Sequence, residues 1–169
     1  DVPNCRGGTL YIANPSGNTG QVIDVTPYLC NFELCIVDEA YADFCSVHSI
    51  LHNYPDNVIV VKTLSKSLGI GGFRVGFCVA NEYITERLQA TRSNFICSSF
   101  ASKIVPQIIN ETPGVVTRML FTKKYLEGNY HCKPSNANYV LFSKTNQFTN
   151  KFNARILQGY YLMSLTDIE

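Results

Sequence analysis

Short, nearly uninterrupted apolar runs constrain the fold of this chain more than any other feature of its sequence. Four of them recur in the first half, and most are separated by segments long enough for a short helix. Because the runs do not alternate between polar and apolar residues, they are typical of strands buried on both faces of a parallel sheet. We therefore predict an α/β fold built from βαβ units, with strands near Leu10–Ala13, Leu34–Val37, Val58–Val61 and Val75–Ala80 and helices near Thr26–Phe32 and Ser46–Asn53.

The connection between the third and fourth runs is the exception to this pattern. It is largely Gly and Ser, and at about a dozen residues it is close to the shortest crossover that joins parallel strands. We therefore predict that the fourth strand runs antiparallel to its neighbour in a mostly parallel sheet with flanking helices.

The second half of the sequence is predicted to be more helical. Asn81 is a typical N-cap for a helix that continues through Leu88, and a second helix is expected from Ser99 to Asn110. Thr112-Pro-Gly then breaks the pattern, so we expect a large domain over residues 1–112 and a small α+β domain over residues 113–169. In the small domain we expect helices and strands in alternation, at Val115–Leu126, Asn138–Phe142, Phe148–Leu157 and Tyr160–Leu165.

Charge and cysteine content narrow the class of protein. The 169 residues carry 14 basic and 13 acidic side chains, a net charge of +1, which argues against a nucleic-acid binder with a basic face. Charged residues, at 16%, are scarce for a free-standing domain. The longest apolar region, Val58 to Ala80, contains three basic residues and is therefore not expected to span a membrane. Seven cysteines without a Cys-x-x-Cys motif suggest free thiols in a reducing cytoplasm, so we predict a soluble, cytoplasmic protein.

Polar residues follow the predicted strands at the points where those strands end. Asn14 follows the first strand, Asp38 and Tyr41 the second, and Ser65 and Lys66 the third. Because ligands of open parallel sheets bind outside the carboxyl ends of the strands, we expect these side chains to meet at one edge.

The chemistry of these side chains suits one cofactor. A desolvated lysine amine such as that of Lys66 is a candidate Schiff-base nucleophile, and the carboxylate of Asp38 would suit a cationic ring nitrogen. Thr63, Ser65 and Arg74, beside a cluster of glycines, suit a phosphate group. Together these features describe pyridoxal 5′-phosphate.

Four segments carry a family resemblance. Residues Thr63–Gly76 (TLSKSLGIGGFRVG) closely resemble the lysine segment of fold-type-I aminotransferases, the aspartate aminotransferase superfamily of class I/II, and the histidinol-phosphate aminotransferase-like branch is nearest. Residues Cys35–Tyr41 are similar to the aspartate motif of that family and Ile12–Gly17 to its Asn-Pro-Thr/Ser-Gly motif. Ser135–Tyr139 resembles the entry to the family's small-domain strand.

The resemblance implies roles for three catalytic residues. Lys66 would form the Schiff base with the cofactor and move the proton of the substrate Cα. Asp38 would pair with the pyridinium nitrogen and keep the ring an electron sink, and Tyr41 would hydrogen-bond the O3′ atom of the ring.

The resemblance also implies four further cofactor-binding residues. Asn14 would join Tyr41 at O3′, although Asn18-Thr-Gly offers a second, poorer alignment of this motif. Thr63, Ser65 and Arg74 would bind the phosphate.

The chain also departs from the family pattern. It has no counterpart of the family's long N-terminal portion, and it ends before the region of the substrate-carboxylate arginine; Gly159–Met163 contains no arginine where relatives often have one. We therefore expect a fragment of a homodimeric, pyridoxal-phosphate-dependent aminotransferase that acts on a small amino or keto acid. A decarboxylase of the same fold, similar to threonine-phosphate decarboxylase, and a non-catalytic remnant of the fold remain as alternatives.

The sequence does not predict a metal site. Cys45, His48 and His52 are spaced so that they would share one helix face, but the sequence offers no fourth ligand and no zinc-protease motif. We interpret these residues as a helix face near the surface and expect no metal.

Overall fold

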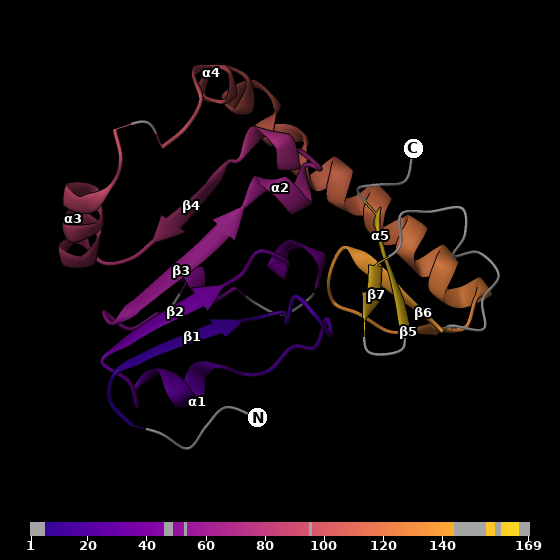
Figure 1. The fold of residues 1–169 in the computed structure, drawn as a ribbon, viewed down its shortest axis with the longest axis horizontal. Coiled ribbons are helices and arrows are strands. Elements are labelled where there is room, and N and C mark those ends of the chain that lie inside the picture. Colours follow the sequence, from indigo (N-terminus) through magenta and orange to yellow (C-terminus); the bar gives the residue numbers. More distant parts are fainter. Residues whose placement is uncertain are drawn as a thin grey trace.

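Two four-stranded sheets form the framework of the computed structural model (Figure 1). The structure describes residues 6–45, 49–52, 54–94, 96–143, 155–157 and 160–165. The first sheet contains β1 (Thr9–Ala13), β2 (Leu34–Asp38), β3 (Val58–Thr63) and β4 (Gly76–Val79), in that spatial order. The second has the order β5-β6-β8-β7, with bounds Cys132–Lys133, Tyr139–Ser143, Tyr160–Ser164 and Arg155–Leu157.

The first sheet confirms the predicted mixture of strand directions. β1, β2 and β3 are parallel, with Ala13 opposite Asp38 and Asp38 opposite Val61. β4 is antiparallel to β3, with Thr63 opposite Gly76, as the short connection between them predicts. An added Cβ at Gly76 would lie 2.8 Å from the carbonyl oxygen of Lys62, so only glycine permits this close approach of the two strands.

One face of the first sheet carries the main apolar core. Cys35, Val37, Val58 and Val60 are fully buried there, and α1 (Thr26–Leu29) packs against them through Leu29. The predicted helix over Thr26–Phe32 thus begins where expected and ends three residues early. Of the helix predicted over Ser46–Asn53, residues 46–48 and 53 lie outside the described residues, and Ile50–His52 form a single 3-10 turn. Two further 3-10 turns, Ala42–Phe44 and Gly71–Phe73, belong to this half of the chain.

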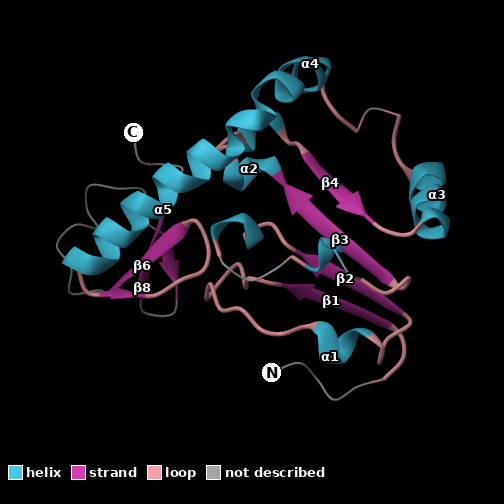
Figure 2. Ribbon diagram, turned by 180° about the vertical axis from the view of Figure 1, so that it is seen from behind, coloured by secondary structure: helices cyan, strands magenta, loops and turns pink. Residues whose placement is uncertain are grey.

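Among the described residues, three longer helices and a further short one complete the fold, and Figure 2 shows where they lie. Asn81 accepts a hydrogen bond from the backbone N–H of Ile84 and caps α3 (Glu82–Thr91), which confirms the predicted N-cap. α4 (Ser99–Ile108) is capped by Ser98 and leads through a 3-10 turn, Ile109–Glu111, into α5 (Thr112–Asn129). α2 (Leu64–Ser67) follows β3 directly.

The second sheet is antiparallel and packs against α5. β6 is buried along most of its length and pairs with β8 over Tyr139–Ser143 and Tyr160–Ser164. Met119 and Leu126 of α5 pack on its core. The helix predicted over Phe148–Leu157 is wrong at its end: residues 155–157 form β7, whose backbone bonds to β8 outweigh a helical preference, and residues 148–154 lie outside the described part of the chain.

Among the described residues, no helix combines the length and the apolar character needed to cross a bilayer.

Candidate active site

The carboxyl ends of β1, β2 and β3 lie at one edge of the first sheet, and the predicted site residues follow them (Figure 1). Asp38 ends β2, Asn14 immediately follows β1, and Thr63 ends β3. The backbone N–H of Asn14 donates to the carbonyl of Asp38 over 2.9 Å, which extends the parallel pairing by one residue beyond β1. Lys66 lies on α2, one residue beyond Ser65.

Thr63 fixes the start of the helix that carries Lys66. Its side-chain oxygen accepts a 3.1 Å hydrogen bond from the backbone N–H of Ser65, and its hydroxyl donates to the carbonyl of Val75 over 3.0 Å. The backbone N–H of Leu64 donates to the same carbonyl over 3.2 Å. Thr63 thereby joins the cap of α2 to the residue that precedes β4, and the position of the lysine is set by both strands.

Lys66 lies against an aromatic ring rather than a carboxylate. Its Nζ is 5.4 Å from the ring centroid of Tyr41, within the range of a cation–π contact. In the part of the chain that the structure describes, no acidic side chain forms an ion pair with Lys66. The amine therefore has a weak partner that a ligand can replace at small cost.

Tyr41 is supported in turn by the second sheet. The rings of Tyr41 and Tyr139 are edge to face, with centroids 5.9 Å apart and planes at 85°. Tyr139 is only 2% exposed, burial raises the pKa of its phenol, and its hydroxyl donates to the carbonyl of Ser16 over 3.4 Å. Nearby, the side-chain amide and the backbone N–H of Asn136 both donate to the carbonyl of Gly20. The loop that follows β1 and the start of β6 are thus joined beside the site.

Asp38 is held by two donors, one on each carboxylate oxygen. The backbone N–H of Ala40 donates to Oδ1 over 3.0 Å, and the hydroxyl of Tyr11 donates to Oδ2 over 2.6 Å. The bond to Asp38, with burial and the charge of the carboxylate as smaller causes, raises the pKa of Tyr11 to about 12. The sequence analysis did not identify Tyr11. The available signal was its position on β1, two residues before Ala13, which places its side chain on the same face of the sheet as that of Asp38.

Asn14 is buried, and its carboxamide is bound to the backbone. Nδ2 donates to the carbonyl of Ile23 over 2.9 Å, and Oδ1 accepts from the N–H of Ile23 over 3.1 Å. The side chain therefore closes the loop that follows β1, and one N–H of its amide group remains for another acceptor.

Arg74 lies in the glycine-rich turn between α2 and β4. Its backbone is left-handed, with φ of 56°, and its guanidinium donates to the carbonyl of Gly71 over 3.0 Å rather than to the hydroxyl of Thr63 or Ser65. Because a guanidinium has five donors, this contact leaves most of its hydrogen-bonding capacity available.

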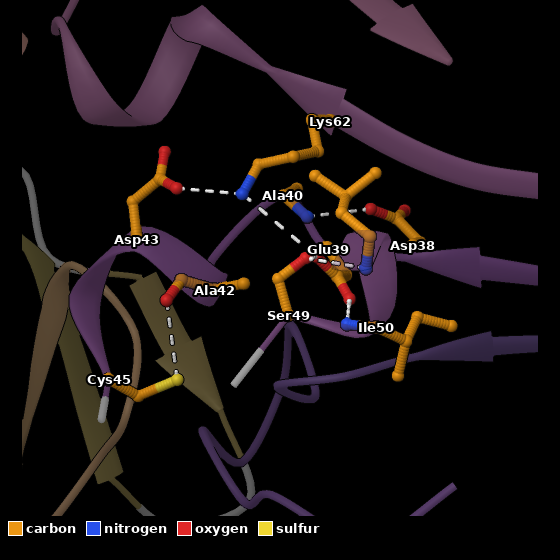
Figure 3. A network of polar contacts seen from close by, with 10 residues as sticks. Asp38, Glu39, Ala40, Ala42, Asp43, Cys45, Ser49, Ile50 and Lys62 are labelled. Atoms are coloured by element: carbon orange, nitrogen blue, oxygen red, sulfur yellow. Dashed lines mark hydrogen bonds and ion pairs between the residues drawn. The ribbon is translucent and has the colours of Figure 1, made fainter. Parts of the chain in front are cut away.

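A partly buried ionic network next to the site was missed by the sequence analysis (Figure 3). Glu39 is only 4% exposed and accepts from the hydroxyl of Ser49 and, over 3.0 Å, from the backbone N–H of Ile50. Nζ of Lys62 lies 3.9 Å from Oε2 of Glu39 and 2.8 Å from Oδ1 of Asp43. The signal for this network in the sequence was Lys62, a charged residue at the end of an apolar run, because a lysine in a largely buried strand needs a carboxylate partner.

The described residues contain no cluster of three or more metal-ligating side chains. Of the three residues considered for a metal, Cys45 donates to the carbonyl of Ala42 over 3.4 Å, whereas His48 and the side chain of His52 lie outside the described residues.

Comparison with known protein families identifies the family to which the chain belongs. The family model "Aminotransferase class I and II" matches residues 5–158, and the chain therefore belongs to that family. The chain is 29% identical over 158 residues to a histidinol-phosphate aminotransferase from Mycobacterium ulcerans, an alignment that covers 85% of this chain and 41% of the relative. The chain thus spans about two fifths of the length of the curated relatives it matches.

Solved structures share the fold. The histidinol-phosphate aminotransferase from Clostridium acetobutylicum superposes with a TM-score of 0.71 at 17% identity, covering 92% of this chain and 58% of that one. L-threonine-O-3-phosphate decarboxylase from Porphyromonas gingivalis gives a TM-score of 0.72 at 16% identity, covering 93% and 59%. These likenesses confirm the predicted α/β class with its mostly parallel sheet.

Proposed function

We propose that the protein containing this chain is a pyridoxal-phosphate-dependent aminotransferase. The observation that carries the proposal is the Lys66 amine, held over the ring of Tyr41 without an acidic partner among the described residues, at the same sheet edge as Asp38. Membership of the class I and II family and the histidinol-phosphate aminotransferase relatives support it. The substrate class is a small amino acid or amino phosphate together with a keto acid.

The donors and acceptors present at this edge fit the cofactor. Asp38 uses one site on each oxygen for Ala40 and Tyr11, and a carboxylate offers about four lone-pair sites, so it can still accept from a ring N–H. Ser65 and Arg74 would hold the phosphate, with the guanidinium as its main counter-charge. The hydroxyl of Thr63 would have to exchange its bond to the carbonyl of Val75 for one to the phosphate. Tyr41 and Asn14 would donate to the phenolic oxygen of the ring.

When bound, pyridoxal phosphate supplies an electron sink for a substrate carbanion. Lys66 would attach the cofactor and, once the substrate amine takes its place, accept the proton of the substrate Cα and return it during the reaction. Asp38, charged and fixed by its two donors, would keep a proton on the ring nitrogen. Tyr41 would orient both Lys66 and the ring.

The test is covalent trapping. We expect the protein, incubated with pyridoxal phosphate and reduced with borohydride, to gain the mass of one reduced cofactor on the peptide that contains Lys66. Lys66→Ala should gain none, whereas Lys103→Ala, a change at an exposed lysine of α4, should behave as wild type. Absence of the adduct from wild type, or its retention in Lys66→Ala, would contradict the proposal and favour a non-catalytic member of the fold.

A decarboxylase is the second candidate, favoured by the structural likeness to L-threonine-O-3-phosphate decarboxylase. Both reactions need the same electron sink, so the residues at this site suit either one. The products separate them: a keto acid with conversion of the cofactor to its amine form indicates an aminotransferase, and release of carbon dioxide without a keto acid indicates the decarboxylase.

We also propose that the intact protein is a cytoplasmic homodimer, and that the chain divides into cofactor and C-terminal domains at residues 112 and 113. Size-exclusion chromatography with light scattering tests the dimer, and limited proteolysis tests the boundary.

A further inference from the structure

We propose that Tyr11 is a positioning residue for Asp38, and that its hydroxyl sets the carboxylate in the orientation that receives the ring nitrogen of the cofactor. This inference rests on the proposed function, because it assigns Asp38 to the cofactor ring. It assigns a role to a residue that no sequence motif singled out.

The sheet register explains how Tyr11 reaches Asp38. Tyr11 lies opposite Ile36 and Ala13 opposite Asp38, so the side chains of Tyr11 and Asp38 project from the same face, on neighbouring strands and two residues apart along them. The phenol spans this diagonal, and its oxygen lies 2.6 Å from Oδ2 of Asp38. That separation is typical of a short, charge-assisted O–H···O⁻ bond.

Each of the two donors to Asp38 binds a different carboxylate oxygen. The backbone N–H of Ala40, on the turn after β2, holds Oδ1, and Tyr11 on β1 holds Oδ2. A carboxylate held at a single oxygen can still rotate about its terminal torsion, which is broad in side chains of this type. The second bond from a neighbouring strand removes that freedom and leaves lone pairs on both oxygens for a further donor.

Tyr11 is suited to act as a permanent donor. Its hydrogen bond to Asp38 is the largest cause that raises the pKa of its phenol to about 12, so the hydroxyl keeps its proton throughout the physiological range. Its side chain is also 62% exposed, so removal of the hydroxyl leaves the apolar core unchanged. Tyr11→Phe therefore removes this hydrogen bond without disturbing the packing of the core.

The test compares two cofactors that differ only at the ring nitrogen. Dissociation constants are measured by titration of cofactor-free protein with pyridoxal phosphate and with its analogue in which a CH group replaces the ring nitrogen. We expect Tyr11→Phe to bind pyridoxal phosphate about tenfold more weakly, as the loss of a hydrogen bond to a charged group implies. The analogue has no ring nitrogen for Asp38 to bind, so its affinity should be unchanged.

Tyr83→Phe is the matched control, because Tyr83 is equally exposed and its hydroxyl contacts Arg87 on α3 rather than the site. Equal weakening of both cofactors by Tyr11→Phe would indicate a merely structural role and overturn the inference, as would no weakening of either. If wild type binds pyridoxal phosphate no better than the analogue, or binds neither, the assignment of Asp38 within the proposed function fails, a result distinct from the failure of Tyr11 alone.

Discussion

Two lysines four residues apart occupy opposite kinds of surroundings in this protein. Lys62, on β3, is bound by the carboxylates of Asp43 and Glu39, and Lys66, on α2, lies against the ring of Tyr41. A lysine whose charge is already balanced by two carboxylates would lose that stabilisation if it reacted. A lysine beside an aromatic ring loses little. The contrast distinguishes a structural cation from one available for covalent chemistry.

The largest expected effect would come from Lys66. We expect Lys66→Ala to lower the turnover rate by about 10²–10⁴-fold, the usual contribution of a positioned acid–base group, because the amine of Lys66 is the group proposed to move the Cα proton. Steady-state rates with saturating amino donor measure this. An activity within tenfold of wild type would end the distinction between the two lysines.

Lys62 should affect stability instead. Lys62→Met leaves Glu39, only 4% exposed, without its cationic partner, and we expect the free energy of unfolding to fall by about 2–3 kcal/mol. Urea denaturation followed by circular dichroism measures the loss.

The double variant Lys62→Met/Glu39→Gln is the control, since it removes the uncompensated charge as well. Its loss should be smaller than the sum of the two single losses. The reduced adduct at Lys66 should form in Lys62→Met as in wild type, and its absence would show that the network belongs to the site.

Tyr139 tests whether support from the second sheet reaches Lys66. We expect Tyr139→Leu to cost about 1–2 kcal/mol of stability through loss of its packing on Tyr41 and to weaken cofactor binding. Phe142→Leu, on the same strand but the other face, removes an equally buried ring that packs on Tyr130. It should cost similar stability and leave cofactor affinity unchanged. Equal affinities for the two variants would show that Tyr41 needs no such support.

The smallest expected effect is spectroscopic and concerns Tyr11. Its raised pKa means that the neutral phenol favours the folded state, so this contribution is complete below pH 10 and is lost as the pH rises towards about 12. Asp38→Asn removes the charged acceptor, and the pKa of Tyr11 should then fall towards the ordinary 10.0. The ultraviolet absorbance of tyrosinate measures the pKa of Tyr11. In wild type and in Asp38→Asn alike, the signal of Tyr11 is the difference between the protein with Tyr11 and the same protein carrying Tyr11→Phe. An unchanged pKa would show that the bond to Asp38 is not what raises it.

Local patterns in the sequence were sufficient for the first sheet. Continuous apolar runs predicted β1 to β3, and a connection close to the shortest possible crossover predicted the direction of β4, because both depend on neighbouring residues. The edge at which Asp38 and Lys66 lie followed from that topology. The roles of these residues towards a cofactor stay predictions.

The contacts that were missed join residues far apart in the chain. The Tyr11–Asp38 bond depends on the register of two strands, and the Tyr41–Tyr139 contact on how the second sheet packs. Neither leaves a periodic pattern in the sequence. The same limit explains the wrong helix at residues 155–157, since pairing with β8 is a property of the partner strand.

The contact between Tyr41 and Tyr139 has a consequence for how the chain can be divided. A piece that ended at residue 112 would retain every side chain assigned to the cofactor. The ring of Tyr41, which contacts Lys66, would nevertheless lose its packing partner Tyr139. The smallest part of the molecule that carries the motifs is therefore not the smallest part that could work. Engineers who transplant this site would have to carry the start of β6 along with it.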